Sequence, residues 1–128
     1  MRIAIPVWQS RVSPVFDAAR ELMVVDVEDG REISRTIYPI AEPWLPRKAA
    51  RLRELGTDVL ICGAISRPLH ALVAGQGIQI VPWIAGFVDE VLYAFLSGQL
   101  PHPRFMMPGC CGPRMRRRGH GGPPWLRA

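Results

Sequence analysis

Cysteines, long apolar runs and acidic residues near the C-terminal end are scarce or missing in this sequence of 128 residues. Three cysteines, Cys62, Cys110 and Cys111, are too few for a disulfide framework, which excludes the small disulfide-stabilised secreted domains. No apolar stretch approaches the roughly 20 residues that cross a bilayer, and the first residues lack the apolar region of a signal peptide. We therefore expect a cytoplasmic protein without a membrane partner, whose cysteines are free thiols.

Charge is distributed unevenly along the chain. Residues 1–100 carry 10 basic and 11 acidic side chains, whereas residues 101–128 carry six arginines and no acid, so the net charge of +5 arises from the last segment. Proline and glycine make up 11 of these last 28 residues. Such a segment buries too little surface to offset its ordering entropy. We predict an α/β domain over residues 1–100 and a flexible basic tail over residues 101–128.

Apolar patterns in the first hundred residues predict five strands and three helices in the order β-β-β-α-β-α-β-α. The strands are expected at residues 3–7, 22–27, 32–38, 58–62 and 78–81, and the helices at 45–56, 66–75 and 88–98. Asp29-Gly30 predicts an antiparallel hairpin between the second and third strands. Single helices between the later strands predict parallel neighbours. The sheet should therefore be mixed, with helices packed over it.

Four short segments carry a resemblance to a known family: IAIPV at 3–7, VSPVFD at 12–17, ICGAI at 61–65 and GIQIV at 77–81. In this order and spacing they resemble the dinitrogenase iron-molybdenum cofactor accessory proteins, the NifX-like family. The resemblance implies a ribonuclease-H-like fold. It also implies binding, carriage or storage of an iron-sulfur or related metal cluster without turnover, together with a protein that donates or accepts the cluster.

One position departs from the pattern of the nitrogenase members, which carry Ser-x-His-Phe-Gly after the first strand. Here residues 13–17 read SPVFD, so Val15 replaces the histidine. The resemblance therefore implies an iron-sulfur cluster or iron sulfide as cargo rather than a molybdenum-containing cluster. The segment from Met107 to Arg118 also resembles the basic, glycine-rich extension of members associated with iron-sulfide storage.

Cys110 and Cys111 are the first candidate metal ligands, because the arginines around them favour the thiolate form that iron-sulfur clusters bind. An adjacent pair supplies only two ligands and chelates a single zinc ion poorly. A second chain, which would make a homo-oligomer, or His102 and His120 would have to complete the set. The alternative interpretation is that both are merely exposed thiols of the tail.

Cys62 is the third candidate for cofactor binding. It ends an apolar strand, and the carboxyl ends of parallel strands gather the loops that bind ligands. With the loops Gln9–Asp17 and Trp83–Gly86 it would outline a pocket. A lone cysteine after Val-Leu-Ile is more often a small buried hydrophobic residue, and both interpretations stay open.

No catalytic motif is present, and we expect no enzyme activity. The first strand has no carboxylate for a two-metal site, and neither a phosphate-binding Gly-x-x-x-x-Gly-Lys loop nor a Gly-x-Ser-x-Gly elbow occurs. The alternative function is a metal-free interaction module whose basic tail contacts an acidic partner or nucleic acid. Nucleic acid is the less favoured partner, because no aromatic residue interleaves with the tail arginines to stack on bases.

Overall fold

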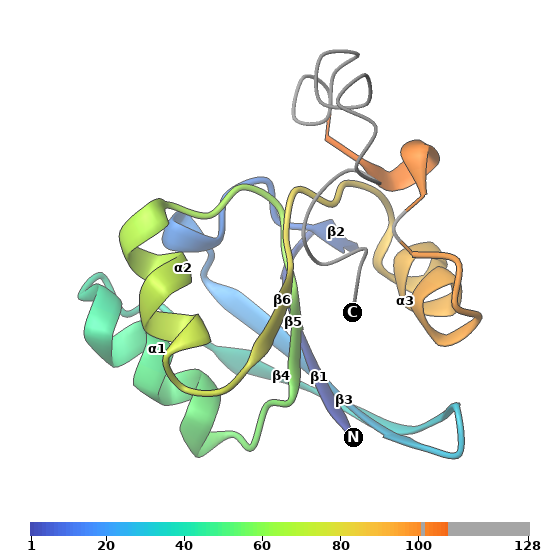
Figure 1. The fold of residues 1–128 in the computed structure, drawn as a ribbon, viewed down its shortest axis with the longest axis horizontal. Coiled ribbons are helices and arrows are strands. Elements are labelled where there is room, and N and C mark those ends of the chain that lie inside the picture. The colour runs from blue at the N-terminus through green and yellow to red at the C-terminus, as the bar shows by residue number, and fades with distance from the viewer. Residues whose placement is uncertain (101, 108–128) are drawn as a thin grey trace.

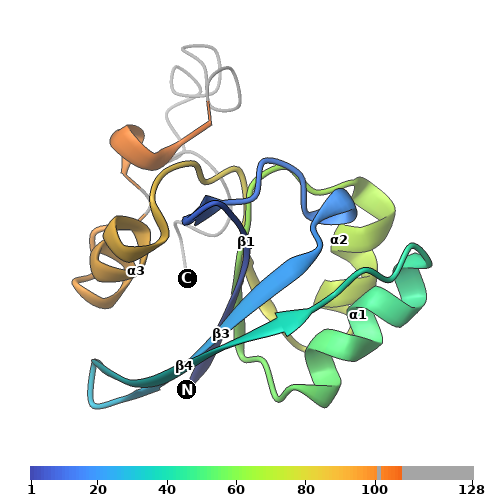
Figure 2. The same ribbon diagram turned by 180° about the vertical axis from the view of Figure 1, so that it is seen from behind.

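A computed structural model describes residues 1–100 and 102–107 of the chain (Figure 1). A mixed sheet separates α1 and α2 on one face from α3 on the other (Figures 1 and 2). The strands are β1 (Arg2–Trp8), β2 (Arg11–Val12), β3 (Glu21–Glu28), β4 (Arg31–Pro39), β5 (Val59–Ile61) and β6 (Gln79–Val81). The helices are α1 (Leu45–Glu54), α2 (Arg67–Ala74) and α3 (Val88–Leu96), with short 3₁₀ helices at Phe16–Ala18 and Pro103–Phe105.

The sheet has the order β4-β3-β1-β5-β6, and β2 pairs with the end of β1. The predicted mixed sheet and three helices are confirmed, but the prediction of five strands is wrong, because β2 is a sixth. It is only two residues long, too short to show a period. The ribonuclease-H-like label and the division at residue 100 stay predictions, and residues 101 and 108–128 lie outside the described part.

Local turn chemistry and connection length account for the two kinds of strand pairing. β3 and β4 are antiparallel through the turn at Asp29 and Gly30, whose φ values are 53° and 75°. β1, β5 and β6 are parallel neighbours, as strands joined through helices should be. Within the described residues, none of the helices has the length and apolar character that crossing a membrane requires.

Pro6 lies inside β1, although proline cannot donate to a sheet ladder. Met1 and Val27 exchange backbone hydrogen bonds of 2.9 and 2.8 Å. The backbone N–H and C=O groups of the odd-numbered residues of β1 therefore point toward β3, and those of the even-numbered residues point toward β5. The β5 pairing ends at Ala4. The missing N–H of Pro6 therefore falls beyond the end of β5, while its carbonyl accepts from Ser13 at 2.8 Å.

The outer strand β4 is the exposed edge of the sheet, and three features interrupt it. The register shifts between Asp26 and Val27 of the neighbouring β3, and Pro39 ends the strand. Arg35 holds ion pairs to Glu32 at 2.6 Å and to Asp89 of α3 at 2.7 Å. Bulges, proline and charges are the devices that keep an edge from pairing with another chain.

The loop after β1 and the loop after β5 touch at Gly63. A Cβ atom on Gly63 would lie 2.5 Å from the Ser13 carbonyl oxygen and 2.6 Å from that of Pro14. Hydrogen bonds of 2.8 Å from Ala64 N–H to Pro14 and from Phe16 N–H to Ala64 hold the loops at this spacing. Only glycine fits, because both opposing atoms belong to the backbone.

Gly63→Ala should therefore lower the free energy of unfolding by about 1–3 kcal/mol, the usual cost of overpacking. Urea unfolding followed by circular dichroism measures it. Gly30→Asn is the matched control, since Gly30 faces open space and asparagine tolerates its positive φ, and it should cost less than about 1 kcal/mol. Equal losses in the two variants would contradict the close contact.

Candidate functional site

Three loops meet at the carboxyl ends of β1, β5 and β6. We call residues 8–19, 62–66 and 82–87 together the loop edge. Val12 N–H donates to the Gly86 carbonyl at 3.0 Å, and Trp83 N–H donates to that of Gly63 at 2.9 Å. The loops after β1 and β6 therefore meet beside the end of β5, while the pocket expected there with Cys62 stays a prediction.

The loop edge exposes an unusual amount of apolar surface. Its exposed large hydrophobic side chains are Trp8 (55%), Val15 (43%), Trp83 (38%) and Phe87 (46%). They are four of the nine such side chains in the part of the chain that the structure describes. Clustered exposed apolar side chains mark interaction surfaces, whereas isolated ones need no explanation.

An arginine lies between two of these aromatic side chains. Arg11 is the antiparallel partner of both Trp8 and Phe87, so the three side chains point to the same face. The Arg11 guanidinium carbon lies 4.3 Å from the centre of the Phe87 ring, a cation–π contact. Among the described residues Arg11 has no ion-pair partner. Its charge is therefore free for an anionic ligand.

A buried lysine fixes the backbone of the loop after β1. Lys48 of α1 is 1% exposed, and its Nζ donates to the carbonyl oxygens of Phe16 at 3.1 Å and Asp17 at 2.7 Å. Burial lowers the pKa of Lys48, while the nearby charges of Asp17 and Glu42 favour its protonated form. The Phe16–Ala18 turn is thus tied to α1.

The carboxylate of Asp17 ties the same turn to α2. It accepts hydrogen bonds from Ser66 N–H at 2.9 Å and from Ser66 Oγ at 2.5 Å. Ser66 Oγ in turn accepts from Leu69 N–H and caps the helix.

Sequence reasoning did not find the role of Lys48. A signal was present, because Lys48 falls at i+3 from Leu45, on the apolar stripe of α1.

Cys62 lies in the core beneath the loop edge. Its side chain is fully buried, its N–H donates to the Val81 carbonyl at 3.0 Å, and its carbonyl accepts from Ile84. Burial, assisted by the charge of Asp17, raises the pKa of the Cys62 thiol well above its usual range. This position fits the interpretation as a small buried hydrophobic residue. A role as cluster ligand stays a prediction that the burial disfavours.

The other predicted ligands are distributed differently. Cys110, Cys111 and His120 lie outside the described residues. His102 is exposed, and its Nδ1 accepts from Arg104 N–H at 3.1 Å. Within residues 1–100 and 102–107, no group of three or more histidine, cysteine, aspartate or glutamate side chains is arranged to hold a metal ion.

Residues 102–107 form a strap that returns to the loop edge. Phe105 is buried, its carbonyl accepts from Ala85 N–H at 2.6 Å, and Arg104 pairs with Glu90 of α3. Met107 N–H donates to the Trp83 carbonyl at 2.8 Å. Cys110 follows Met107 by three residues, which span at most about 11 Å. Met107, the last residue that the structure describes, therefore lies at the loop edge.

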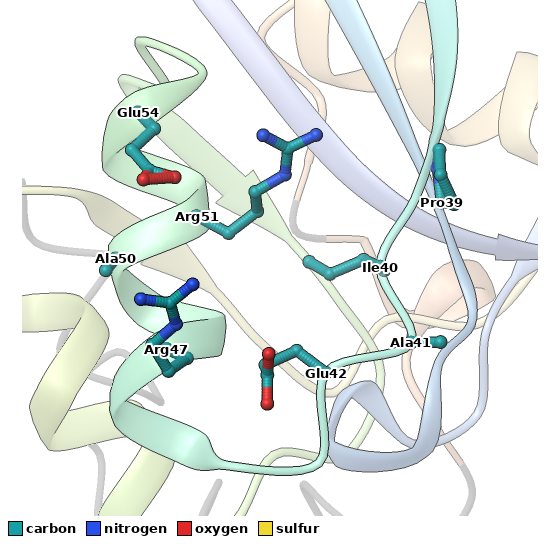
Figure 3. Close-up of a pocket in the computed structure, with 8 residues that line it drawn as sticks. All are labelled: Pro39, Ile40, Ala41, Glu42, Arg47, Ala50, Arg51 and Glu54. Atoms are coloured by element: carbon teal, nitrogen blue, oxygen red, sulfur yellow. The ribbon is translucent and has the colours of Figure 1, made fainter.

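A separate hollow of about 420 Å³ lies between α1 and the connection that precedes it (Figure 3). It is lined by Pro39, Ile40, Ala41, Glu42, Arg47, Ala50, Arg51 and Glu54. Figure 3 shows Arg47 and Arg51 extending from α1 next to residues 39–42. Glu54 lies toward one end of the hollow and Glu42 toward the other. Two positive and two negative side chains with no histidine or cysteine do not make a site for a thiophilic metal.

Comparisons with known proteins converge on one group. The family model described as dinitrogenase iron-molybdenum cofactor matches residues 1–98. An uncharacterized protein of Methanocaldococcus jannaschii is 25% identical over 105 residues, covering 78% of this chain and 89% of its own length. The apo form of the orange protein from Desulfovibrio gigas has a similar fold, with a TM-score of 0.66 and 22% identity over 82% of this chain and 94% of that one.

Replacing Lys48 with methionine should lower the free energy of unfolding by about 1–3 kcal/mol, because the Asp17 carbonyl loses its Lys48 donor and the Phe16 carbonyl keeps only the hydrogen bond from Ala19 N–H. Chemical denaturation measures the change. Arg47→Met is the matched control on the preceding, exposed residue and should change stability by less than about 0.5 kcal/mol. A Lys48→Met protein as stable as the control would show that the buried ammonium is dispensable.

The buried thiol of Cys62 should resist alkylation. In a Cys110→Ser, Cys111→Ser protein, iodoacetamide at pH 8 should leave the native chain unlabelled, because the raised pKa keeps Cys62 protonated and burial blocks access. The same protein unfolded in urea should take up one label, as mass spectrometry would report. Rapid labelling of the native chain would refute the core assignment.

Proposed function

Since the chain belongs to the dinitrogenase iron-molybdenum cofactor family, we propose that it binds and carries an iron-sulfur cluster or iron sulfide without catalysing a reaction. The ligands in this proposal are the thiolates of Cys110 and Cys111, and the loop edge provides the adjoining surface. The cluster is cargo, received from one protein and passed to another. A structural neighbour, the orange protein, has a known structure of its apo form, and the existence of an apo form is consistent with a bound group in that protein.

The observation that carries the proposal is the hydrogen bond between Met107 and Trp83. It holds Met107, three residues before Cys110 in the sequence, against the backbone of Trp83 at the loop edge. A cluster held by thiolates at 110 and 111 is therefore within reach of this surface.

Charge supports an anionic cargo. Residues 108–128 contain five arginines and no acidic residue, and Arg11 adds a positive charge at the loop edge. Iron-sulfur clusters ligated by thiolates carry negative charge, so Coulomb attraction favours their retention. The same arginines favour deprotonation of the neighbouring cysteines, which is the form that binds iron.

The side chain at position 15 supports iron sulfide over a molybdenum-containing cluster. Val15 is 43% exposed at the loop edge, in the place where the nitrogenase members carry histidine. A valine offers no ligand atom to a metal. The chain therefore lacks the imidazole with which those members are equipped, whereas its two tail thiols are typical iron-sulfur ligands.

The carboxylates of the domain support a non-catalytic role. Asp17 is engaged by Ser66, and Asp26 accepts hydrogen bonds from Arg2 at 2.7 Å and Ser34 at 3.0 Å. The hydrogen bond from Arg2 is the largest cause of the lowered pKa of Asp26. Both carboxylates are thus engaged in holding the fold together.

Anaerobic reconstitution with iron and sulfide tests the proposal. The wild-type chain, after desalting, should retain iron and sulfide and show charge-transfer absorption in the visible range. The Cys110→Ser, Cys111→Ser protein should lose both the absorption and the bound iron, because serine hydroxyls are poor ligands for clusters. Cys62→Ala is the matched control and should retain the wild-type iron content.

Each outcome has one meaning. A wild-type protein without iron would refute the cluster function and favour the alternative, a metal-free interaction module that uses the exposed row of Trp8, Arg11 and Phe87. Full iron in the double serine variant would refute the assignment of the tail thiols. Loss of iron in the folded Cys62→Ala protein would make Cys62 a ligand.

A further inference from the structure

The hollow beside α1 is lined by two arginines that have no ion-pair partner. In the part of the chain that the structure describes, neither Arg47 nor Arg51 takes part in an ion pair. Both side chains extend from α1 next to residues 39–42 (Figure 3). They border a space of about 420 Å³ whose other walls include the apolar side chains of Ile40 and Ala50. Two guanidinium groups are thus available to a ligand in this space.

An exposed tryptophan precedes these arginines on the same side of α1. Trp44 is the residue immediately before the helix and is 63% exposed, and its N–H donates to Glu42 Oε1 at 3.2 Å. Trp44, Arg47 and Arg51 are three and four residues apart, which is the spacing of neighbours along one side of a helix. Tryptophan and arginine are prominent among the residues that carry binding energy in protein interfaces. The row therefore has the composition of a docking site.

A tyrosine of the sheet restrains one of the arginines. The guanidinium carbon of Arg51 lies 5.9 Å from the centre of the Tyr38 ring, a cation–π contact. Both side chains are half-buried, whereas Arg47 is exposed. A side chain that is already held in place loses less conformational entropy when a ligand binds. Arg51 is thus the preorganised member of the pair.

The charge around the hollow favours a compact acidic partner. α1 carries four basic residues and one acidic residue. Arg20 is exposed, and its carbonyl accepts from Ile40 N–H at 2.8 Å, so a further arginine adjoins the wall of the hollow. Glu42 and Glu54 lie toward the two ends (Figure 3). These two carboxylates repel a long polyanion such as a nucleic-acid strand, but they leave the positive centre open to a single acidic segment.

We propose that this hollow is the docking site for an acidic segment of another protein. A carboxylate of that segment binds to Arg47 and Arg51, and an adjoining apolar side chain packs on Trp44. Arginine suits this role because its planar fork of donors matches the two oxygens of a carboxylate. The inference stands whether or not the chain carries a cluster, since none of these residues is a proposed cluster ligand.

The hollow lies at the same end of the sheet as the loop edge. Glu21 of β3 is the antiparallel partner of both Val7 of β1 and Pro39 of β4, so β1 and β4 end side by side across β3. Lys48 of α1, next to Arg47 in the chain, also holds the backbone of the loop after β1. A protein docked in the hollow is therefore placed beside the loop edge.

Nuclear magnetic resonance of the full chain, labelled with ¹⁵N, tests the inference because it reports each arginine Nε–H group and each indole N–H group separately. The probe is a short synthetic peptide with two glutamates beside one leucine. It should shift the signals of Arg47, Arg51 and Trp44 until they saturate, and added NaCl should weaken its binding. Arg47→Gln with Arg51→Gln should lower the affinity about tenfold or more, because charge-assisted hydrogen bonds are lost.

A second pair of arginines provides the matched control. Arg53→Gln with Arg67→Gln removes the same charge, but neither residue lines the hollow, and Arg53 donates to Gln76 at 3.1 Å. This variant should bind the peptide within about twofold of wild type, because exposed charges outside the site are screened. Circular dichroism would verify that both variants are folded. Both should also retain the wild-type iron content after reconstitution, so the docking site and the cluster function are tested separately.

Each other outcome overturns the docking site. A peptide that causes no saturable shift at Arg47 and Arg51 would refute it. Equal losses of affinity in the two double variants would reduce the binding to net charge. Tighter binding of single-stranded oligothymidylate through the same signals would make the partner a nucleic acid, and citrate binding as tightly as the peptide would make the hollow a site for small anions.

Discussion

The buried ammonium group of Lys48 is the interaction on which the geometry of the loop edge depends. Burying a lysine is unfavourable unless its donors are satisfied, and here the carbonyl oxygens of Phe16 and Asp17 satisfy two of them. Asp17 passes this constraint on to α2 through Ser66. The helices α1 and α2 thus fix the backbone of the Phe16–Ala18 turn. The loop that follows β1 therefore keeps its conformation although it exposes apolar side chains to solvent.

The features that the sequence predicted well are those set by neighbouring residues. The hairpin follows from Asp29-Gly30, whose left-handed backbone conformations are local properties. The three helices follow from apolar spacing and from stop signals such as Gly98. The two-residue strand β2 escaped because its conformation depends on pairing with Val7 and Trp8 and on a contact with Phe87, not on a period of its own.

The site was harder to predict because its parts are far apart in sequence. The approach of the loops at the ends of β1, β5 and β6 follows from parallel topology and was foreseen. The environment of Lys48 was not, since its partners lie 31 and 32 residues away. Phe105 and the two methionines after it lie in a segment rich in proline, glycine and arginine that shows no apolar period. The burial of Phe105 beside Gly86 requires a surface that exists only after α3 has packed.

The irregular edge at β4 has a consequence for the size that any assembly of this protein reaches. A regular open strand would let sheets join side by side without limit, and each added copy would present the same unsatisfied backbone to the next. The bulge, Pro39 and the paired charges of Arg35 obstruct that route at β4, and β6, the strand at the opposite edge, is only three residues long. An assembly that formed through one self-complementary face would then close on itself as a discrete particle and would not extend into a fibre.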